Sequence, residues 1–201
     1  MNKITRALVF ALLVAPVAAS AEQPKAPAAD TTQKDTTQKE KPAKLTDTEL
    51  QVMAHYHGVN QMEIDLGKAA SKKAANKDVK AYGDMLVKEH GEADKKLMAL
   101  AKQTHQTVPA EKPASDVEKQ AKAEQKAMAT KLKTMKGADF DREYLRMMVQ
   151  GHEKELAQID TKKSEVTNAE LSAMLDELKP MLQHHEDAAK ELQKNEPTAT
   201  R

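Results

Sequence analysis

The fold is decided by residues 76–100, which read NKDVKAYGDMLVKEHGEADKKLMAL. Apolar side chains recur there at three- and four-residue spacing, which aligns them along one stripe of an α-helix: Val79, Tyr82, Leu86, Ala93, Leu97 and Leu100. His90 lies within this stripe and not on the charged face. A titratable ring on the dry side of a helix needs a polar partner, because burial without one is costly. That partner must come from another part of the chain.

The composition of the 201 residues predicts an all-α fold. Aromatic residues make up 2% of the chain and charged residues 31%, with 11 Met and no Trp. Sheets need β-branched and aromatic residues, whereas the abundant Ala, Lys, Glu, Leu, Gln and Met favour helix.

Residues 1–21 have the features of a secretory signal peptide. Lys3 and Arg6 form a basic start, residues 8–14 (LVFALLV) form a short apolar core, and residues 19–21 form an A-x-A cleavage pattern. The apolar run is short for a membrane span, although a short anchor is the alternative. We therefore expect a periplasmic protein with no integral membrane span after cleavage. The chain contains no Cys, which excludes lipid attachment at Cys and any disulfide.

The charge balance argues against general binding to nucleic acid or anionic membranes. Removal of residues 1–21 takes away two of the 32 basic residues and none of the 31 acidic ones, which leaves a net charge of −1.

Residues 22–45 are expected to form a disordered linker, because they show no apolar periodicity. They are rich in Pro, Ala, Thr, Gln and Lys and repeat DTTQK at 30–34 and 35–39. The linker is interpreted as a spacer, with contact to the cell wall or to a partner as the alternative. The bundle domain is then expected over residues 46–194, with a polar tail at 195–201.

Local signals predict four long helices and one shorter polar helix in the domain. Capping boxes are expected at Thr46–Glu49, Ser115–Glu118 and Thr167–Glu170, and Asn76 is expected to cap the second helix. The helices should cover about 47–75, 76–104, 115–137, 139–166 and 167–194. Gly137 is expected at the C-terminal end of the polar helix, Asp139 at the start of the next, and Pro180 at a kink or bulge in the last.

The expected architecture is two helical hairpins joined by a long crossover. The polar helix over 115–137 has a thin apolar stripe, consisting of Val117, Ala121, Met128 and Leu132. It is therefore interpreted as a connecting segment more than as a core helix. Long connections of this kind occur in ferritin-like bundles.

Each long helix carries one unusual polar residue on its apolar stripe: Glu63, His90, His152 and His185. At about 1.5 Å rise per residue they lie roughly 20, 20, 22 and 27 Å from the hairpin turns, so all four can be level in the bundle. One carboxylate and three imidazoles suit Zn, Cu, Fe or Ni. Neighbouring Glu89 and Glu186 either accept hydrogen bonds from the histidines or face solvent.

The alternative is that the histidines are neutral core residues, hydrogen-bonded to Glu63 or to a tyrosine: Tyr56, Tyr82 or Tyr144. The other candidate metal ligands are less suitably placed to bind one ion together. His55 and His57 lie on different helix faces, and His184 points away from His185. The methionines suit Cu(I) but are also ordinary core filling. Without a Gly-rich phosphate loop or a Ser near a His/Asp pair, hydrolase and nucleotide-binding functions are unsupported.

Six sequence blocks between Thr46 and Leu192 resemble the DUF4142 family, secreted bacterial proteins of unassigned function grouped with the ferritin-like superfamily. The blocks are residues 63–67, 76–82, 85–90, 137–145, 148–153 and 178–185. The resemblance implies a ferritin-like four-helix bundle with an extra connecting helix between its second and third long helices. This chain departs from the family at Gly151, where an acid usually precedes the histidine.

The di-iron proteins of this fold use Glu-x-x-His pairs, but Val87 and Leu182 stand three residues before His90 and His185. A ferroxidase centre is therefore not expected. The leading hypothesis is a periplasmic bundle protein that binds one transition-metal ion and serves in envelope stress protection. The alternative is a metal-free structural or chaperone-like envelope protein, and a third is an oxidative enzyme at one metal. The metal, the envelope partner or small ligand, and the oligomeric state stay open.

Overall fold

The computed structural model describes residues 43–195, and every regular element in that part of the chain is helical. The five helices are α1 (Asp47–Lys73), α2 (Lys77–Gln103), α3 (Asp116–Leu132), α4 (Gly137–Ser164) and α5 (Ala169–Asn195). The all-α prediction is confirmed. The expected signal peptide, most of the linker and the last six residues of the tail lie outside the described residues. No helix within 43–195 has the length and apolarity to cross a membrane.

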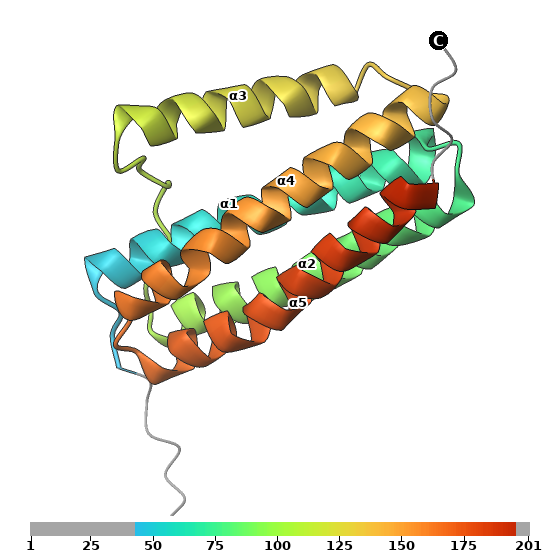
Figure 1. Cartoon of the computed structure of the whole chain (residues 1–201). Helices are drawn as coiled ribbons and strands as arrows, with labels where there is room; N and C mark the ends of the chain where they lie inside the picture. The colour runs from blue at the N-terminus through green and yellow to red at the C-terminus, as the bar shows by residue number, and fades with distance from the viewer. Residues whose placement is uncertain (1–42, 196–201) are drawn as a thin grey trace, which may run out of the picture. The chain divides into compact units, whose positions relative to one another are not determined.

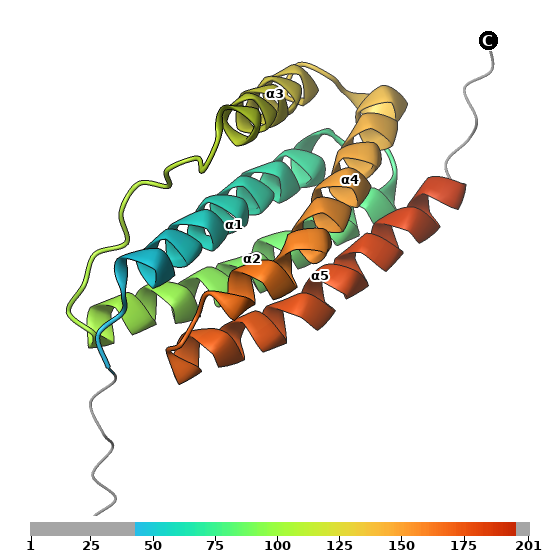
Figure 2. The same cartoon turned by 60° about the vertical axis from the view of Figure 1, so that its left-hand side comes forward.

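The four long helices form a bundle of two antiparallel hairpins, α1–α2 and α4–α5 (Figures 1 and 2). Helix α3 lies outside the bundle beside α1 and α4, and with 17 residues it is shorter than the four long helices (Figure 1). This crossover makes α4 start at the end of the bundle where α1 turns into α2. The predicted ferritin-like four-helix bundle with an extra connecting helix is confirmed.

Two buried carboxylates hold the hairpins together at opposite ends of the bundle. Glu49 at the start of α1 accepts hydrogen bonds from the backbone of Thr167 and Asn168 before α5, at 2.8 and 2.7 Å. Asp141 in α4 accepts from the backbone of Ala75 and Asn76 in the α1–α2 turn, at 3.1 and 2.8 Å. Burial alone raises the pKa of Glu49, but these hydrogen bonds outweigh burial and lower it to about 2.

The backbones of α1 and α2 approach each other closely at Gly67 and Gly83. A Cβ atom on Gly67 would lie 2.5 Å from the carbonyl oxygen of Gly83, and one on Gly83 would lie 2.8 Å from the oxygen of Gly67. Only glycine permits this spacing at both positions, so the pair sets how tightly the first hairpin closes.

Several predicted helix ends need correction. Helix α3 ends at Leu132 and not at Gly137, which begins α4 with a left-handed φ of 64° and so replaces Asp139 as its first residue. The Thr167–Glu170 capping box is wrong, because Asn168 Oδ1 accepts from the Leu171 backbone at 3.0 Å and Thr167 bonds Glu49 instead. The capping box at Thr46 and the cap at Asn76 are confirmed. At α3, Ser115 Oγ accepts from the Glu118 backbone as predicted, but the Glu118 side chain accepts from the Ala114 backbone and not from that of Ser115. Helix α5 continues through Pro180.

Two apolar clusters fill the bundle, one toward each end. Leu45, which was assigned to the linker, belongs to one of them and is 5% exposed. Val117 was placed on the thin apolar stripe of the connecting helix, but it is 79% exposed and so does not pack against the bundle. Only Ala129 and Leu132 of α3 are buried, because most other side chains of this helix are polar and the four long helices already enclose the core.

Candidate metal centre

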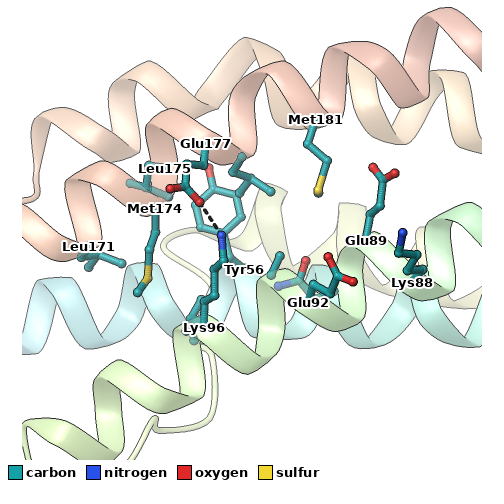
Figure 3. A pocket seen from close by; sticks show the side chains of 14 residues that line it. Tyr56, Lys88, Glu89, Glu92, Lys96, Leu171, Met174, Leu175, Glu177 and Met181 are labelled. Atoms are coloured by element: carbon teal, nitrogen blue, oxygen red, sulfur yellow. Dashed lines mark hydrogen bonds and ion pairs between the residues drawn. The ribbon is translucent and has the colours of Figure 1, made fainter.

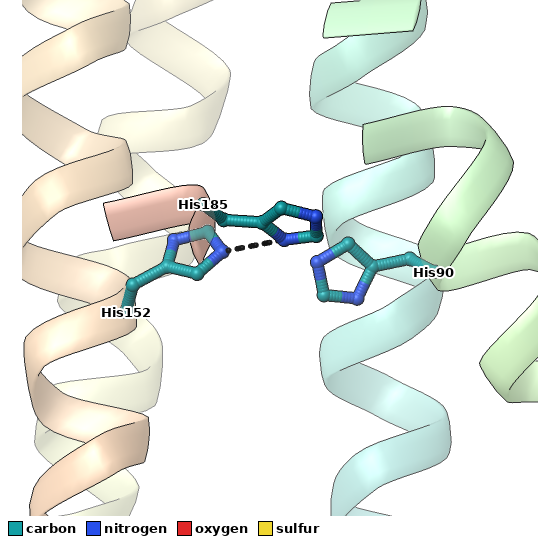
Figure 4. Close-up of side chains that lie close together, drawn as sticks. All are labelled: His90, His152 and His185. Carbon is teal, nitrogen blue, oxygen red and sulfur yellow. Dashed lines mark hydrogen bonds between the residues drawn. The ribbon is translucent and has the colours of Figure 1, made fainter. Parts of the chain in front are cut away.

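Three histidines from three different helices converge between the two apolar clusters. His90 comes from α2, His152 from α4 and His185 from α5, and each is at most 2% exposed. One ring nitrogen from each lies within 4.8 Å of those of the other two. Figure 4 shows the three rings turned toward one point. The level positions expected from counting along the helices therefore hold for these three residues.

The outward nitrogen of each ring contacts an oxygen atom. His90 Nδ1 lies 2.9 Å from Asn60 Oδ1, His152 Nδ1 lies 2.8 Å from the Met148 carbonyl, and His185 Nε2 lies 2.9 Å from a Glu89 carboxylate oxygen. These oxygens accept hydrogen bonds, so each outward nitrogen carries the N–H proton. This sets the tautomer of all three neutral rings.

The inward nitrogens are then lone pairs with no hydrogen-bond donor among the described residues. His90 Nε2 is buried and has no partner. His152 Nε2 faces His185 Nδ1 at 3.3 Å, and in these tautomers neither nitrogen has a proton to donate. Three facing lone pairs repel one another unless a proton or a cation lies between them. Outward N–H groups held by a carboxylate or carbonyl are also the usual support of metal-binding histidines.

Burial keeps these rings neutral. It lowers the pKa of His90 well below the ordinary value of 6.5, and the neighbouring rings lower it further. Burial also lowers the pKa of His152 to about 4, although its bond to the Met148 carbonyl opposes the shift. The pKa of His185 is lowered by burial against the opposing effect of Glu89. Because metals bind neutral imidazole, protons compete weakly at neutral pH.

Glu63 is buried on α1 but is not among the atoms that converge with the histidines. Asn60, one turn earlier on α1, contacts His90 instead. Burial and the charge of Glu155 raise the pKa of Glu63 to about 8, and its Oε2 has no hydrogen-bond partner within the described chain. Glu63 is therefore a second buried polar group with its own surroundings.

The expected hydrogen-bond partners of a purely structural histidine core do not occur in the described structure. None of the three rings bonds Glu63 or a tyrosine side chain; Tyr82 donates instead to the His185 backbone carbonyl at 3.1 Å. The hydroxyls of Tyr56 and Tyr144 are buried without a partner among residues 43–195. Glu89 acts as an acceptor for His185, whereas Glu186 pairs with Lys190.

A different histidine, His55, lies between two carboxylates. Its Nδ1 is 2.6 Å from Glu111 in the α2–α3 connection and its Nε2 is 2.8 Å from Glu155 in α4. Burial lowers the pKa of His55, but these two hydrogen bonds outweigh burial and raise it. Lys122 of α3 pairs with Glu111 and with Glu118. His55, Glu111 and Glu118 could hold a metal ion by spacing alone, yet both ring nitrogens and Glu111 already have partners of opposite charge.

The other predicted histidines are placed apart from the centre. His57 pairs with Asp94 at 2.7 Å, on a different side of α1 from His55 as the spacing predicted. His184 is exposed, next to buried His185.

A family comparison matches residues 33–192 to the domain of unknown function DUF4142. The chain belongs to the DUF4142 family. The resemblance drawn from the six sequence blocks is confirmed, and the match extends to residues before Thr46. No curated protein matches the chain.

Solved structures with the same fold come from other helical proteins. The DUF4142 chain superposes on a DUF305 fragment from Deinococcus radiodurans with a TM-score of 0.65 and 15% identity, over 76% of this chain and 99% of that one. It superposes on CopM in the Cu(II)-bound form with a TM-score of 0.57 and 20% identity, over 76% and 99%. For the Cu(I)-bound form of CopM the values are 0.54, 21%, 73% and 93%. At these identities the likeness shows the fold.

A cavity of about 270 Å³ lies beside the three histidines of this DUF4142 domain, between α2 and α5. Both Asn60 and Glu89, which hold His90 and His185, line it. Figure 3 shows the Lys96–Glu177 ion pair joining α2 to α5 at this cavity, with an N–O distance of 2.6 Å. Two of the three residues that accept hydrogen bonds from the rings, Asn60 and Glu89, therefore border a cavity.

Asn60 is the site residue that sequence reasoning missed. Its signal was present, because asparagine is a poor helix former and here stands inside a long helix. It also continues the buried stripe of Met53, Tyr56 and Glu63 on α1, whereas the neighbouring Val59 is half-buried.

Proposed function

We propose that this DUF4142 protein binds one transition-metal ion through His90 Nε2, His152 Nε2 and His185 Nδ1. The observation that carries the proposal is the set of three inward lone pairs without a donor, each on a ring whose outward N–H is held by an oxygen. Imidazole nitrogens suit Zn and Cu, and neutral rings are ready to bind. Three protein ligands leave a further coordination position for water or another ligand.

Copper is the first ion to test, with zinc second. CopM, which shares the fold, has been crystallised in Cu(II)-, Cu(I)- and silver-bound forms. Glu63 is left out of the ligand set in this proposal, because Asn60 occupies the position on α1 that faces His90. The secretion pattern in residues 1–21 supports a periplasmic location, where a bound ion would serve metal handling and stress protection in the envelope.

The first prediction concerns stoichiometry and the ligand set. Protein produced without an affinity tag and stripped of metal is titrated with Cu(II) and, separately, with Zn(II), and binding is followed by calorimetry and elemental analysis. We expect one ion per chain. Glu89→Gln should weaken binding by about 10- to 100-fold, since it removes the acceptor that orients His185. His185→Gln should weaken it further, because it removes a ligand.

The neighbouring histidine supplies a matched control. His184→Gln changes an exposed ring one residue away and should bind the ion as the unchanged protein does. If the unchanged protein takes up no ion, or if His184→Gln and His185→Gln lose binding equally, the three-histidine centre is wrong. A metal-free protein in which His185→Gln lowers only the unfolding free energy would support the structural role.

A further inference from the structure

A second cavity lies between α3 and the bundle, and methionines from three helices line it. Its volume is about 170 Å³. Met62 comes from α1, Met128 from α3, and Met147 and Met148 from α4. The remaining lining is Glu63, Leu66, Ala121, Glu124, Gln125, Gln150, Gly151 and Lys154. Thioether sulfur is a soft ligand, so this lining differs in kind from the imidazoles of the first centre.

Glu63 gives the cavity a buried carboxyl group. The residue is 3% exposed, and its Oε2 has no hydrogen-bond partner among the described residues. Gly151 opposite it has no side chain, and a Cβ there would approach Glu63 Oε1 to 3.8 Å. A carboxylate that is buried away from water and lacks hydrogen-bond donors is stabilised by binding a proton or a cation.

We infer that this cavity binds a soft monovalent cation, Cu(I) or Ag(I), through the sulfurs of Met62, Met147 and Met148 and the carboxylate of Glu63. Met128 lies at the edge, because its sulfur accepts a contact from Arg146 Nη2 at 3.7 Å. A hard cation such as Ca²⁺ needs six to eight oxygen ligands, and the inner end of the cavity offers one carboxylate. Soft thioether donors beside one buried carboxyl group, which can lose its proton to a bound cation, fit one soft, singly charged ion.

This site shares no ligand with the three-histidine centre, so the two can be tested apart. The probe is Ag(I), which does not change oxidation state, added to protein carrying ¹³C in its methionine methyl groups. Spectra are recorded for the unchanged sequence and for His185→Gln. We expect the methyl signals of Met62, Met147 and Met148 to shift in both proteins and to saturate at one ion. Met174 and Met181, which line the cavity between α2 and α5, should not shift.

Paired substitutions separate binding from folding. Met62→Leu with Met147→Leu conserves volume and should weaken Ag(I) binding by about 10-fold or more with an unchanged melting temperature. Met174→Leu with Met181→Leu is the matched control and should bind as before. Glu63→Gln, which keeps the shape but removes the carboxyl group that can ionise when a cation binds, should also weaken binding. The inference is overturned if Ag(I) shifts none of the three methyl groups, or if the Met62/Met147 double variant binds Ag(I) as tightly as the unchanged protein.

Discussion

At the scale of single residues, the buried polar side chains of this bundle fall into two groups: those with hydrogen-bond or ion-pair partners, and those without. Glu49 and Asp141 accept backbone hydrogen bonds at the hairpin ends, and His55 lies between two carboxylates. Two buried atoms of the candidate sites, His90 Nε2 and Glu63 Oε2, have no partner within residues 43–195, as do the hydroxyls of Tyr56 and Tyr144. Buried polar groups are nearly always paired in proteins, so the two atoms of the candidate sites point to groups that the chain does not itself supply.

The ion pairs of His55 lead to a prediction about how the unfolding free energy depends on pH. The folded pKa of this histidine is raised, so its charged pairs with Glu111 and Glu155 stabilise the fold fully below about pH 6.5, the value in the unfolded chain. That stability is lost as the pH rises through the folded pKa, because the ring then loses its proton. At pH 6, His55→Gln should lower the unfolding free energy by about 3 kcal/mol, as for a broken buried ion pair. Urea unfolding at pH 6 and pH 9 measures the difference, which should shrink at the higher pH.

The exposed pair provides the comparison for His55. His57, which is partly exposed and pairs with Asp94, should cost only about 0–1 kcal/mol when changed to Gln. An effect of His55→Gln that is the same at pH 6 and pH 9 would mean that its charge does not hold the α2–α3 connection to the bundle.

At the scale of the helices, the two hairpins are built differently from the connecting helix. Helices α1 and α2 approach closely enough that Gly67 and Gly83 touch through their backbones, whereas α3 buries only Ala129 and Leu132. Its ion pair to a residue outside the helix runs from Lys122 to Glu111 of the α2–α3 connection, and Glu111 in turn contacts His55 of α1. Helix α3 should therefore be the first helix to open, since few buried apolar contacts hold it.

Two glycines of α2 give a paired prediction about packing. A Cβ on Gly83 would lie 2.7 Å from Ala70 Cβ and 2.8 Å from the Gly67 oxygen, so Gly83→Ala must push α1 and α2 apart. We expect it to lower the unfolding free energy by about 3 kcal/mol. A Cβ on Gly91 meets nothing within 4 Å, so Gly91→Ala should raise stability by about 0.5–1 kcal/mol through helix propensity. Denaturant unfolding of both variants gives the answer, and equal effects would contradict the close contact.

At the scale of the whole molecule, the three histidines join the two hairpins. His90 belongs to the first hairpin, and His152 and His185 belong to the second. An ion held by all three would cross-link α2, α4 and α5 at mid-height, in a region where the two apolar clusters leave polar side chains between them. Helix α3 contributes no ligand to that centre.

Metal binding should therefore stabilise the molecule unevenly. At a free metal concentration of 100 times the dissociation constant, linkage adds about 2.7 kcal/mol to the unfolding free energy. Hydrogen exchange should slow by about 100-fold for the core amides of α2, α4 and α5, which exchange by global unfolding, and change little in α3. Mass spectrometry of peptides with and without Cu(II) measures this. Equal protection of α3, or none in α5, would argue against an ion shared by the two hairpins.

Much of this arrangement follows from the sequence alone, because it rests on local rules. Apolar spacing, capping residues and glycine set where the long helices begin and end, and the long polar connection sets the crossover. The predicted end of α3 and the predicted cap of α5 were wrong. Gly137 suits either the end or the start of a helix, and it begins α4 with a positive φ. Thr167 bonds the distant Glu49 of α1 instead of capping α5.

Counting residues also brings three histidines to one level. Only the tertiary structure decides which side chain of α1 meets them. Counting along a helix gives height only to within about one turn, and Asn60 and Glu63 lie on the same stripe one turn apart, so the count does not choose between them. The packing of α1 against α2 and α4 gives His90 to Asn60 and leaves Glu63 facing the methionine-lined cavity. Which ring nitrogen points inward is likewise decided by oxygens from other turns and other helices, and no periodicity in the sequence encodes that choice.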